Sequence, residues 1–185
     1  MMTDITARLP ASGPPVPVLI RDTREQRPLV FTRLPWKTGC LQTGDYSIEG
    51  FEDAWTIERK TVADLVSSVI QERPRFEREL ARMDGYTFKR LLVVGTLDDI
   101  RRHRYRSRAN PKSVLASVFA FEVRYGLPCV FATTPEEAAL LVEGWAFYFV
   151  RERALTIPRA RARYSCYNDT RLTRPPAYKL KGTAP

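Results

Sequence analysis

The segment from Gly44 to Asp64 reads GDYSIEGFEDAWTIERKTVAD and contains the clearest strand and helix patterns of the chain. Side chains alternate between two faces along a strand. A strand over residues 54–60 therefore places Thr56, Glu58 and Lys60 on one face and Trp55, Ile57 and Arg59 on the other. Because Trp55 and Ile57 can enter a core, the pattern predicts that Glu58 and Lys60 are presented together where the strand ends.

A helix is predicted directly after this strand. Thr61 has the side chain of a helix N-cap, and the apolar residues that follow recur at helical spacing: Val62, Leu65, Val66, Val69 and Ile70. Asp64 occupies the third helical position, where an acid can bond back to the cap and favour the helix N-terminus. Two interpretations of Asp64 therefore stay open: it caps the helix, or it belongs to a functional site.

A second strand is predicted to follow Asp45, over residues 46–48, with a hairpin turn over residues 50–53. Pairing of the two strands brings Asp45 alongside Glu58. Divalent cations such as Mg²⁺ prefer carboxylate oxygens, and a nearby ammonium can orient water or stabilise developing negative charge. The combination predicts a divalent-cation site, although a Glu-x-Lys pattern alone is more often a solvated strand face.

Length and composition predict one folded domain. The chain has 185 residues, of which 44% are hydrophobic. We expect a domain over residues 16–153, a disordered proline-rich lead-in over residues 1–15 and a basic, flexible tail over residues 154–185. No apolar run approaches the roughly 20 residues that span a bilayer, and the first residues lack the pattern of a signal peptide. A cytoplasmic protein without membrane association is therefore expected.

The residue types narrow the chemistry. His103 is the only histidine, and it lies within an arginine run. Cys40, Cys129 and Cys166 are far apart and lack metal-ligand spacing, which fits a reduced compartment. These observations argue against a Ser-His-Asp triad, a histidine-metal nuclease and a Cys/His zinc site. The remaining candidates for chemistry are carboxylates, lysine and a metal ion.

The rest of the chain predicts an alternation of strands and helices. Further strands are expected over residues 16–21, 29–31, 91–94 and 128–132, and a turn over residues 37–44. Further helices are expected over residues 74–83, from residue 111 and over residues 135–153. Together they predict an α/β domain, a mixed β-sheet flanked by helices on both faces.

Basic residues suggest a polyanionic partner. The formal net charge is +9, and residues 151–185 carry nine Lys/Arg against two acids. This distribution favours a nucleic acid partner, with a tail kept soluble by its charge as the alternative. Five arginines crowd one short stretch: Arg101, Arg102, Arg104, Arg106 and Arg108. We expect them to face a polyanion, from the folded domain or from a disordered loop.

Two predicted helices leave alternatives open. Arg75, Arg78 and Arg82 recur at three- and four-residue spacing, so they either pair with Glu72, Glu77 and Glu79 or contact phosphate. Residues 136–153 are apolar nearly all round. That helix is either fully enclosed or forms a subunit interface, and we favour the interface, which predicts a homodimer.

Four sequence blocks taken together resemble the nuclease motif of the XPF (xeroderma pigmentosum group F) family of structure-specific endonucleases. They are Asp22-Thr23-Arg24-Glu25, Gly44-Asp45-Tyr46, Ile57-Glu58-Arg59-Lys60 and Asp64. The resemblance covers roughly residues 16–150 and implies a restriction-endonuclease-like core. It also implies that Asp45 and Glu58 bind Mg²⁺ or Mn²⁺, with Asp22 as a further ligand, and that Lys60 assists the attacking water. The remaining implied site residues are Glu25, Arg59 and Asp64.

Alternation alone leaves Arg59 on the face opposite Glu58, and burial against a carboxylate such as Asp22 would reconcile this with a site role. Family members also carry a tandem helix-hairpin-helix module, for which residues 151–185 are too few. The resemblance implies a metal-dependent endonuclease acting on branched or flapped duplex DNA. The alternatives are a non-catalytic DNA-binding or scaffolding subunit, or the same chemistry on RNA.

Overall fold

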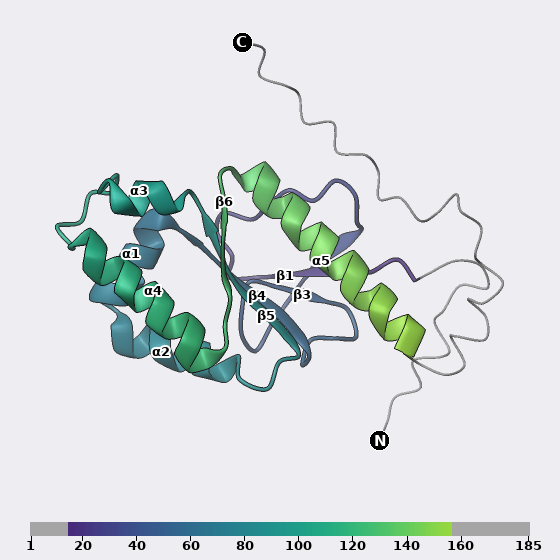
Figure 1. Cartoon of the computed structure of the whole chain (residues 1–185). Helices are drawn as coiled ribbons and strands as arrows, with labels where there is room; N and C mark the ends of the chain where they lie inside the picture. The colour runs from purple at the N-terminus through teal and green to yellow at the C-terminus, as the bar shows by residue number, and fades with distance from the viewer. Residues whose placement is uncertain (1–14, 157–185) are drawn as a thin grey trace, which may run out of the picture. The chain divides into compact units, whose positions relative to one another are not determined.

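The computed structural model describes residues 15–156 of the chain (Figure 1). Residues Val16–Tyr148 form one compact unit, and the described residues from Phe149 to Thr156 belong to a second unit. The sheet and the candidate site acids all lie in the first unit. The predicted lead-in lies outside the described residues apart from Pro15, and so does the predicted tail from residue 157 onward, with the DNA contacts expected of it.

A six-stranded sheet forms the centre of the unit, in the order β2-β1-β3-β4-β5-β6. The strands are β1 (Leu19–Asp22), β2 (Trp36–Gly39), β3 (Tyr46–Ile48), β4 (Trp55–Thr61), β5 (Phe88–Val94) and β6 (Cys129–Ala132). Strand β3 runs antiparallel to β1 and β4, whereas the pairs β1–β2, β4–β5 and β5–β6 are parallel. One end of the sheet therefore brings together the carboxyl ends of β1 and β4 and the amino end of β3.

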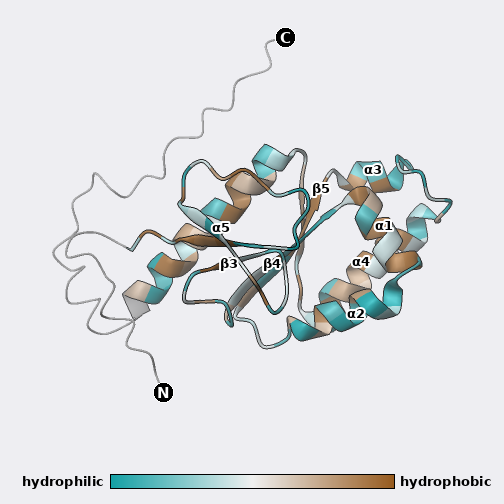
Figure 2. Cartoon of the chain, turned by 180° about the vertical axis from the view of Figure 1, so that it is seen from behind, coloured by the Kyte–Doolittle hydropathy of each residue, from teal (hydrophilic) through white to brown (hydrophobic). Residues whose placement is uncertain are grey.

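Helices cover both faces of the sheet, as predicted (Figure 1). Four of them lie on one face: α1 (Val62–Ile70), α2 (Arg73–Arg82), α3 (Leu97–Arg101) and α4 (Pro111–Tyr125). The fifth, α5 (Pro135–Thr156), lies with residues 135–148 against the other face. Figure 2 shows α2 as largely hydrophilic, because only its sheet-facing side carries apolar residues.

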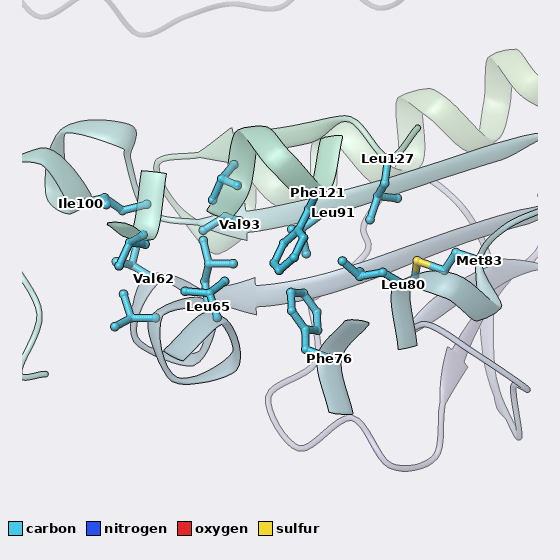
Figure 3. Close-up of a cluster of buried hydrophobic side chains, with 14 residues drawn as sticks. Val62, Leu65, Phe76, Leu80, Met83, Leu91, Val93, Ile100, Phe121 and Leu127 are labelled. Carbon is cyan, nitrogen blue, oxygen red and sulfur yellow. The ribbon is translucent and has the colours of Figure 1, made fainter. Parts of the chain in front are cut away.

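The core between the sheet and α1–α4 is a cluster of buried aliphatic and aromatic side chains (Figure 3). It includes Leu91 and Val93 of β5, and the edge-on ring pair Phe76 and Phe121, whose centroids lie 5.8 Å apart. Phe76 comes from α2 and Phe121 from α4, so this contact joins the two helices above the sheet. Burying one such side chain stabilises the fold by roughly 1.5–3 kcal/mol.

The opposite face is closed by aromatic contacts to α5. Trp55 of β4 stacks on Phe88 of β5 with centroids 5.5 Å apart, and Phe88 contacts Trp145 of α5. Trp55 and Ile57 are fully buried, which confirms that these alternate positions of β4 enter a core. The alternation of β4 thus sends Glu58 and Lys60 to the face that carries α2.

The predicted strand over residues 29–31 is wrong. Leu29 and Phe31 are buried and Val30 is 77% exposed, so the alternation is real. However, the Leu29 N–H donates to the Tyr46 hydroxyl at 2.8 Å instead of to a neighbouring strand. The segment is anchored by side chains and does not join the sheet.

The predicted turn over residues 37–44 is also wrong in part, because residues 36–39 form strand β2. Trp36, Lys37 and Thr38 are exposed at the edge of the sheet. An edge strand that buries neither face has no hydrophobic alternation, so the pattern on which the prediction relied was missing.

Glu143 of α5 is the buried acid that interrupts the apolar helix. Its Oε1 accepts hydrogen bonds from the backbone N–H groups of Thr32, Arg33 and Leu34 at 2.9, 2.7 and 3.1 Å. Ala138, Val142 and Ala146 are fully buried within the unit. The first part of α5 is therefore a core helix, and the predicted homodimer stays a prediction.

Within residues 15–156, no helix is long and apolar enough to cross a bilayer.

Candidate active site

Backbone contacts at the sheet edge fix the position of Asp45. The Asp45 N–H donates to the Ile57 carbonyl, and the Asp45 carbonyl accepts from the Asp22 N–H, each at 2.8 Å. Gly44 precedes it with a φ of 77°, and a Cβ at this glycine would lie 2.1 Å from Thr56 Oγ1. A side chain at position 44 would therefore clash with β4, so glycine is required at this approach.

Asp45 and Glu58 form a pair of mutually repelling carboxylates. Burial is the main cause that raises the pKa of Asp45 to about 7, opposed by the hydrogen bond from the Arg59 backbone N–H to Asp45 Oδ2 at 2.7 Å. Glu58 is 3% exposed. Burial, followed by repulsion from Asp45, raises the pKa of Glu58 to about 8. In the absence of a cation, the fold thus resists placing two negative charges here.

Lys60 forms an ion pair with Glu58 from the same face of β4. Its Nζ lies 2.7 Å from Glu58 Oε1, and the two side chains are 14% and 4% exposed. Burial by itself lowers the pKa of Lys60, but the attraction of Glu58 outweighs it and the pKa is raised. The strand-end presentation of Glu58 and Lys60 is confirmed.

Arg59 is buried on the opposite face of β4, against an acid other than the one expected. Its Nη1 lies 3.8 Å from Glu25 Oε2, and both side chains are less than a tenth exposed. The expected burial of Arg59 against a carboxylate is thereby confirmed, with Glu25 in the place suggested for Asp22. Arg59 Nε is buried and has no hydrogen-bond partner among the described residues. Arg59 therefore joins the two acids: its side chain pairs with Glu25, and its backbone N–H donates to Asp45.

Asp22 is engaged by Arg24 and Leu41. Its Oδ1 accepts from Arg24 N and Nε at 2.8 and 2.7 Å, and its Oδ2 accepts from Leu41 N at 2.7 Å and Arg24 Nη2 at 3.1 Å. Burial by itself raises the pKa of Asp22. These hydrogen bonds lower it by a larger amount, so the pKa lies below its usual value. Both oxygens are occupied, so Asp22 anchors the loops beside the site, and its predicted role as a metal ligand stays a prediction.

Asp64 lies in the helix cap. Its Oδ2 accepts from Thr61 Oγ1 at 2.7 Å and from Thr61 N at 3.3 Å, and the Asp64 N–H donates back to Thr61 Oγ1 at 3.2 Å. This reciprocal pair is a capping box. Within the described part of the chain, the side chain of Asp64 forms hydrogen bonds with Thr61 alone. Its catalytic role stays a prediction.

The pair Asp45 and Glu58 fits a divalent cation by charge. Each keeps one carboxylate oxygen without a hydrogen bond to any residue between 15 and 156. Their mutual repulsion is the kind that a bound cation relieves. No group of three or more acidic, histidine or cysteine side chains among the described residues is arranged around a metal position. Asp45 and Glu58 are the carboxylates of this site that could hold a metal ion.

The predicted phosphate-binding arginines fall into two groups. Arg75 pairs with Glu72 at 2.8 Å, Arg102 pairs with Asp98 at 2.7 Å, and Arg104 pairs with Asp99 at 3.3 Å. The exposed side chains of the other four form no ion pair with a described residue: Arg78, Arg101, Arg106 and Arg108.

The loop after α3 is ordered by its own contacts. The His103 ring Nε2 lies 2.7 Å from the Ser107 carbonyl, and the Tyr105 hydroxyl donates to the Ala109 carbonyl at 2.9 Å.

Glu79 of α2 is a charged neighbour of the site, which the sequence analysis considered only as a possible partner of the helix arginines. It acts electrostatically on Asp45, Glu58 and Lys60. The signal was present in the sequence, because Glu79 follows Phe76 by three residues and therefore shares the inward side of the helix.

The fold and the site define a class: a mixed-sheet α/β domain that presents buried acids and a lysine where its parallel strands end. The chain belongs to the ERCC4 domain family, whose model matches residues 22–144, more than half of the chain. The resemblance inferred from the sequence motifs is thereby confirmed.

Individual relatives agree with this family. The chain is 34% identical over 85 residues to the 3'-flap repair endonuclease Xpf of Saccharolobus solfataricus, over 45% of this chain and 34% of that protein. It thus spans about a third of the length of that curated relative. The structure of XPF from Aeropyrum pernix is similar with a TM-score of 0.63 and 25% identity, over 76% of this chain and 65% of that one.

A second structure of the same relative, XPF from Aeropyrum pernix in complex with DNA, has a TM-score of 0.57 and 23% identity. The match covers 77% of this chain and 69% of that one. At this identity the likeness concerns the fold, which is the mixed sheet flanked by helices that the sequence predicted.

Proposed function

We propose that the chain is a metal-dependent, structure-specific DNA endonuclease that hydrolyses phosphodiester bonds in branched or flapped duplex DNA. The observation that carries the proposal is the buried Asp45–Glu58 carboxylate pair with Lys60 2.7 Å from Glu58. Family membership supports the same activity, and the S. solfataricus relative is named as a 3'-flap repair endonuclease.

Asp45 and Glu58 would hold Mg²⁺ or Mn²⁺, which supplies charge neutralisation and an activated water for phosphodiester hydrolysis. Asp45 is held for this role by the Arg59 backbone N–H, which leaves its second oxygen available. Lys60 presents a charged donor beside Glu58 that can bind a non-bridging phosphate oxygen or orient the water. Arg59 and Glu25 support the strand end from the other face of the sheet.

DNA is the proposed partner, and the exposed arginines that lack an acid partner among the described residues are its proposed phosphate contacts. Arg101, Arg106 and Arg108 follow β5, whose carboxyl end lies at the same sheet edge as that of β4. This arrangement would let one duplex contact the loop and the acid pair.

A panel of labelled flap, fork, nicked and plain duplexes tests the proposal, with Mg²⁺, Mn²⁺ or EDTA. We expect metal-dependent cutting that prefers the branched substrates. A protein that binds these duplexes and cuts none of them would instead be the DNA-binding or scaffolding subunit. Cutting of an RNA panel at an equal rate would contradict the DNA assignment.

A further inference from the structure

Besides Glu58 of its own strand, Lys60 has an acidic neighbour, Glu79, on helix α2. Its Nζ lies 4.9 Å from the centroid of the Phe76 ring, so the ammonium rests against α2 as well as against its own strand. Phe76 and Glu79 are three residues apart and therefore adjacent on one side of this helix. Phe76 is fully buried and Glu79 is half-buried. Glu79 thus lies on the side of α2 that Lys60 contacts.

The charge of Glu79 is felt by Asp45, Glu58 and Lys60 alike. It opposes the negative charges of Asp45 and Glu58 and attracts the Lys60 ammonium. The charge of Glu79 is therefore unfavourable for the acids of the site and favourable for Lys60, so Lys60 is the group that Glu79 can stabilise.

Glu79 is also uncommitted, unlike the other acids of α2 and its cap. Glu72 pairs with Arg75, and Glu77 pairs with Arg73 and Arg124. Glu79 forms neither a hydrogen bond nor an ion pair with any residue that the structure describes. Its carboxylate therefore remains available to a group that changes partner.

Lys60 loses much of its attraction to Glu58 if Glu58 holds a cation. A carboxylate that donates its electron pairs to a divalent cation attracts an ammonium less strongly, yet the Lys60 side chain is only 14% exposed. A buried ammonium without an anionic partner is strongly destabilised. A second carboxylate within reach removes this cost.

Resting on the proposed function, we propose that Glu79 is a positioning residue: it holds the Lys60 ammonium in place when Glu58 binds the divalent cation. Lys60 would then stay beside the reacting phosphate instead of competing with the cation for Glu58. Glu79 acts through Lys60 and is not itself a ligand.

A double-mutant cycle on Mn²⁺ binding tests this role without requiring turnover. Mn²⁺ affinity is measured by calorimetry for wild type, Glu79→Gln, Lys60→Met and the double variant. Glu79→Gln is expected to weaken Mn²⁺ binding by about tenfold, the size of one partly screened charge contact. In the Lys60→Met background the same change is expected to have a clearly smaller effect, because only the direct attraction between Glu79 and the cation is then lost. Methionine keeps the contact with the Phe76 ring.

Glu72→Gln is the matched control, since it removes the same charge from the cap of the same helix at an exposed position. It is expected to leave Mn²⁺ affinity unchanged. Equal weakening by Glu79→Gln in both Lys60 backgrounds would overturn the proposal, because Glu79 would then act directly on the cation. No weakening in either background would overturn it as well. Thermal melts of all variants establish that each is folded before titration.

Kinetics provide a second readout. At saturating Mn²⁺, Glu79→Gln should lower kcat on a flap duplex by about tenfold and leave KM unchanged, and Glu79→Asp should recover most of the loss. A rise in KM with unchanged kcat would contradict a role at Lys60. A wild-type protein that neither binds Mn²⁺ nor cuts DNA would instead refute the proposed function, and with it this inference, by a result distinct from those above.

Discussion

The side chain of Asp45 is tied to β4 through the backbone N–H of Arg59, which donates to Asp45 Oδ2 at 2.7 Å. This bond crosses from the residue before β3 to the strand that carries Glu58. Because the donor is a backbone group, an amide oxygen at position 45 could accept the same bond. Charge at this site can therefore be removed with its shape retained, which makes the acids testable.

Asp45→Asn and Glu58→Gln should each lower cleavage by at least about a hundredfold, because each removes a charged ligand of the cation. DNA binding, measured by fluorescence anisotropy in EDTA, should remain the same or become tighter, since less negative charge opposes phosphate. Glu52→Gln, an exposed residue of the hairpin turn, is the control and should cut normally. Parallel loss of binding and cleavage would mean that the two acids have a structural role.

Without a divalent cation, the protein should become less stable as the pH rises. The folded state raises the pKa of Asp45 to about 7 and of Glu58 to about 8, above the values of 3.8 and 4.5 expected in the unfolded chain. Between these limits the native state binds more protons than the unfolded state, so the free energy of unfolding falls with increasing pH. Lys60 opposes this effect, and Glu25 and Glu79 add to it.

Thermal melts in EDTA between pH 5 and pH 9 measure this dependence. Each kcal/mol lost should lower the melting temperature by about 2–4 °C for a chain of this size. Glu58→Gln should flatten the curve, and Mn²⁺ should restore stability at high pH. A melting temperature that rises from pH 6 to pH 8 in EDTA would show that folding does not raise the pKa values of these two acids.

The capping box predicts that Thr61→Ala and Asp64→Ala each destabilise the fold by about 1 kcal/mol. Because the two side chains bond to each other, the double variant should lose less than the sum of the single losses. Chemical denaturation gives these free energies. Cleavage well below the melting temperature should survive in Asp64→Ala if capping is its role. A large loss of cleavage with unchanged stability would place Asp64 in the active site, as the family resemblance implies.

Replacing Arg101, Arg106 and Arg108 together by alanine should weaken binding to all DNA forms and flatten its salt dependence. Each lost phosphate contact should reduce the log–log slope by roughly 0.9 on duplex DNA. Arg102→Ala with Arg104→Ala should change the slope less, since both arginines already pair with acids of α3. An unchanged slope in the triple variant would show that these arginines are a solvated surface.

Much of the fold could be predicted because local patterns and tertiary structure agree. In β4, alternation identified the apolar face, and the same period placed Glu58 beside Lys60. The cap at Thr61 also lies where side-chain chemistry predicted it.

The parts that could not be predicted depend on contacts distant in sequence. Strand β2 lies at an exposed edge and carries no hydrophobic signal, whereas Leu29 and Phe31 alternate without pairing because Tyr46 supplies the hydrogen bond. In the site, the partner of Arg59 proved to be Glu25, and Asp22 turned out to be bound by Arg24. Spacing identifies candidate acids, but the loops between the strands determine which basic side chain each acid contacts.

Metal-dependent cleavage by the Asp45–Glu58 pair is tested most directly by single-turnover cutting of a labelled flap duplex. Wild type, Glu58→Gln and Lys60→Met are compared with Mn²⁺ and with EDTA. We expect cutting by the wild type with Mn²⁺ only, no cutting by Glu58→Gln, and slow cutting by Lys60→Met at unchanged DNA affinity. Cutting by the wild type in EDTA, or by Glu58→Gln at the wild-type rate, would contradict a nuclease built on this acid pair.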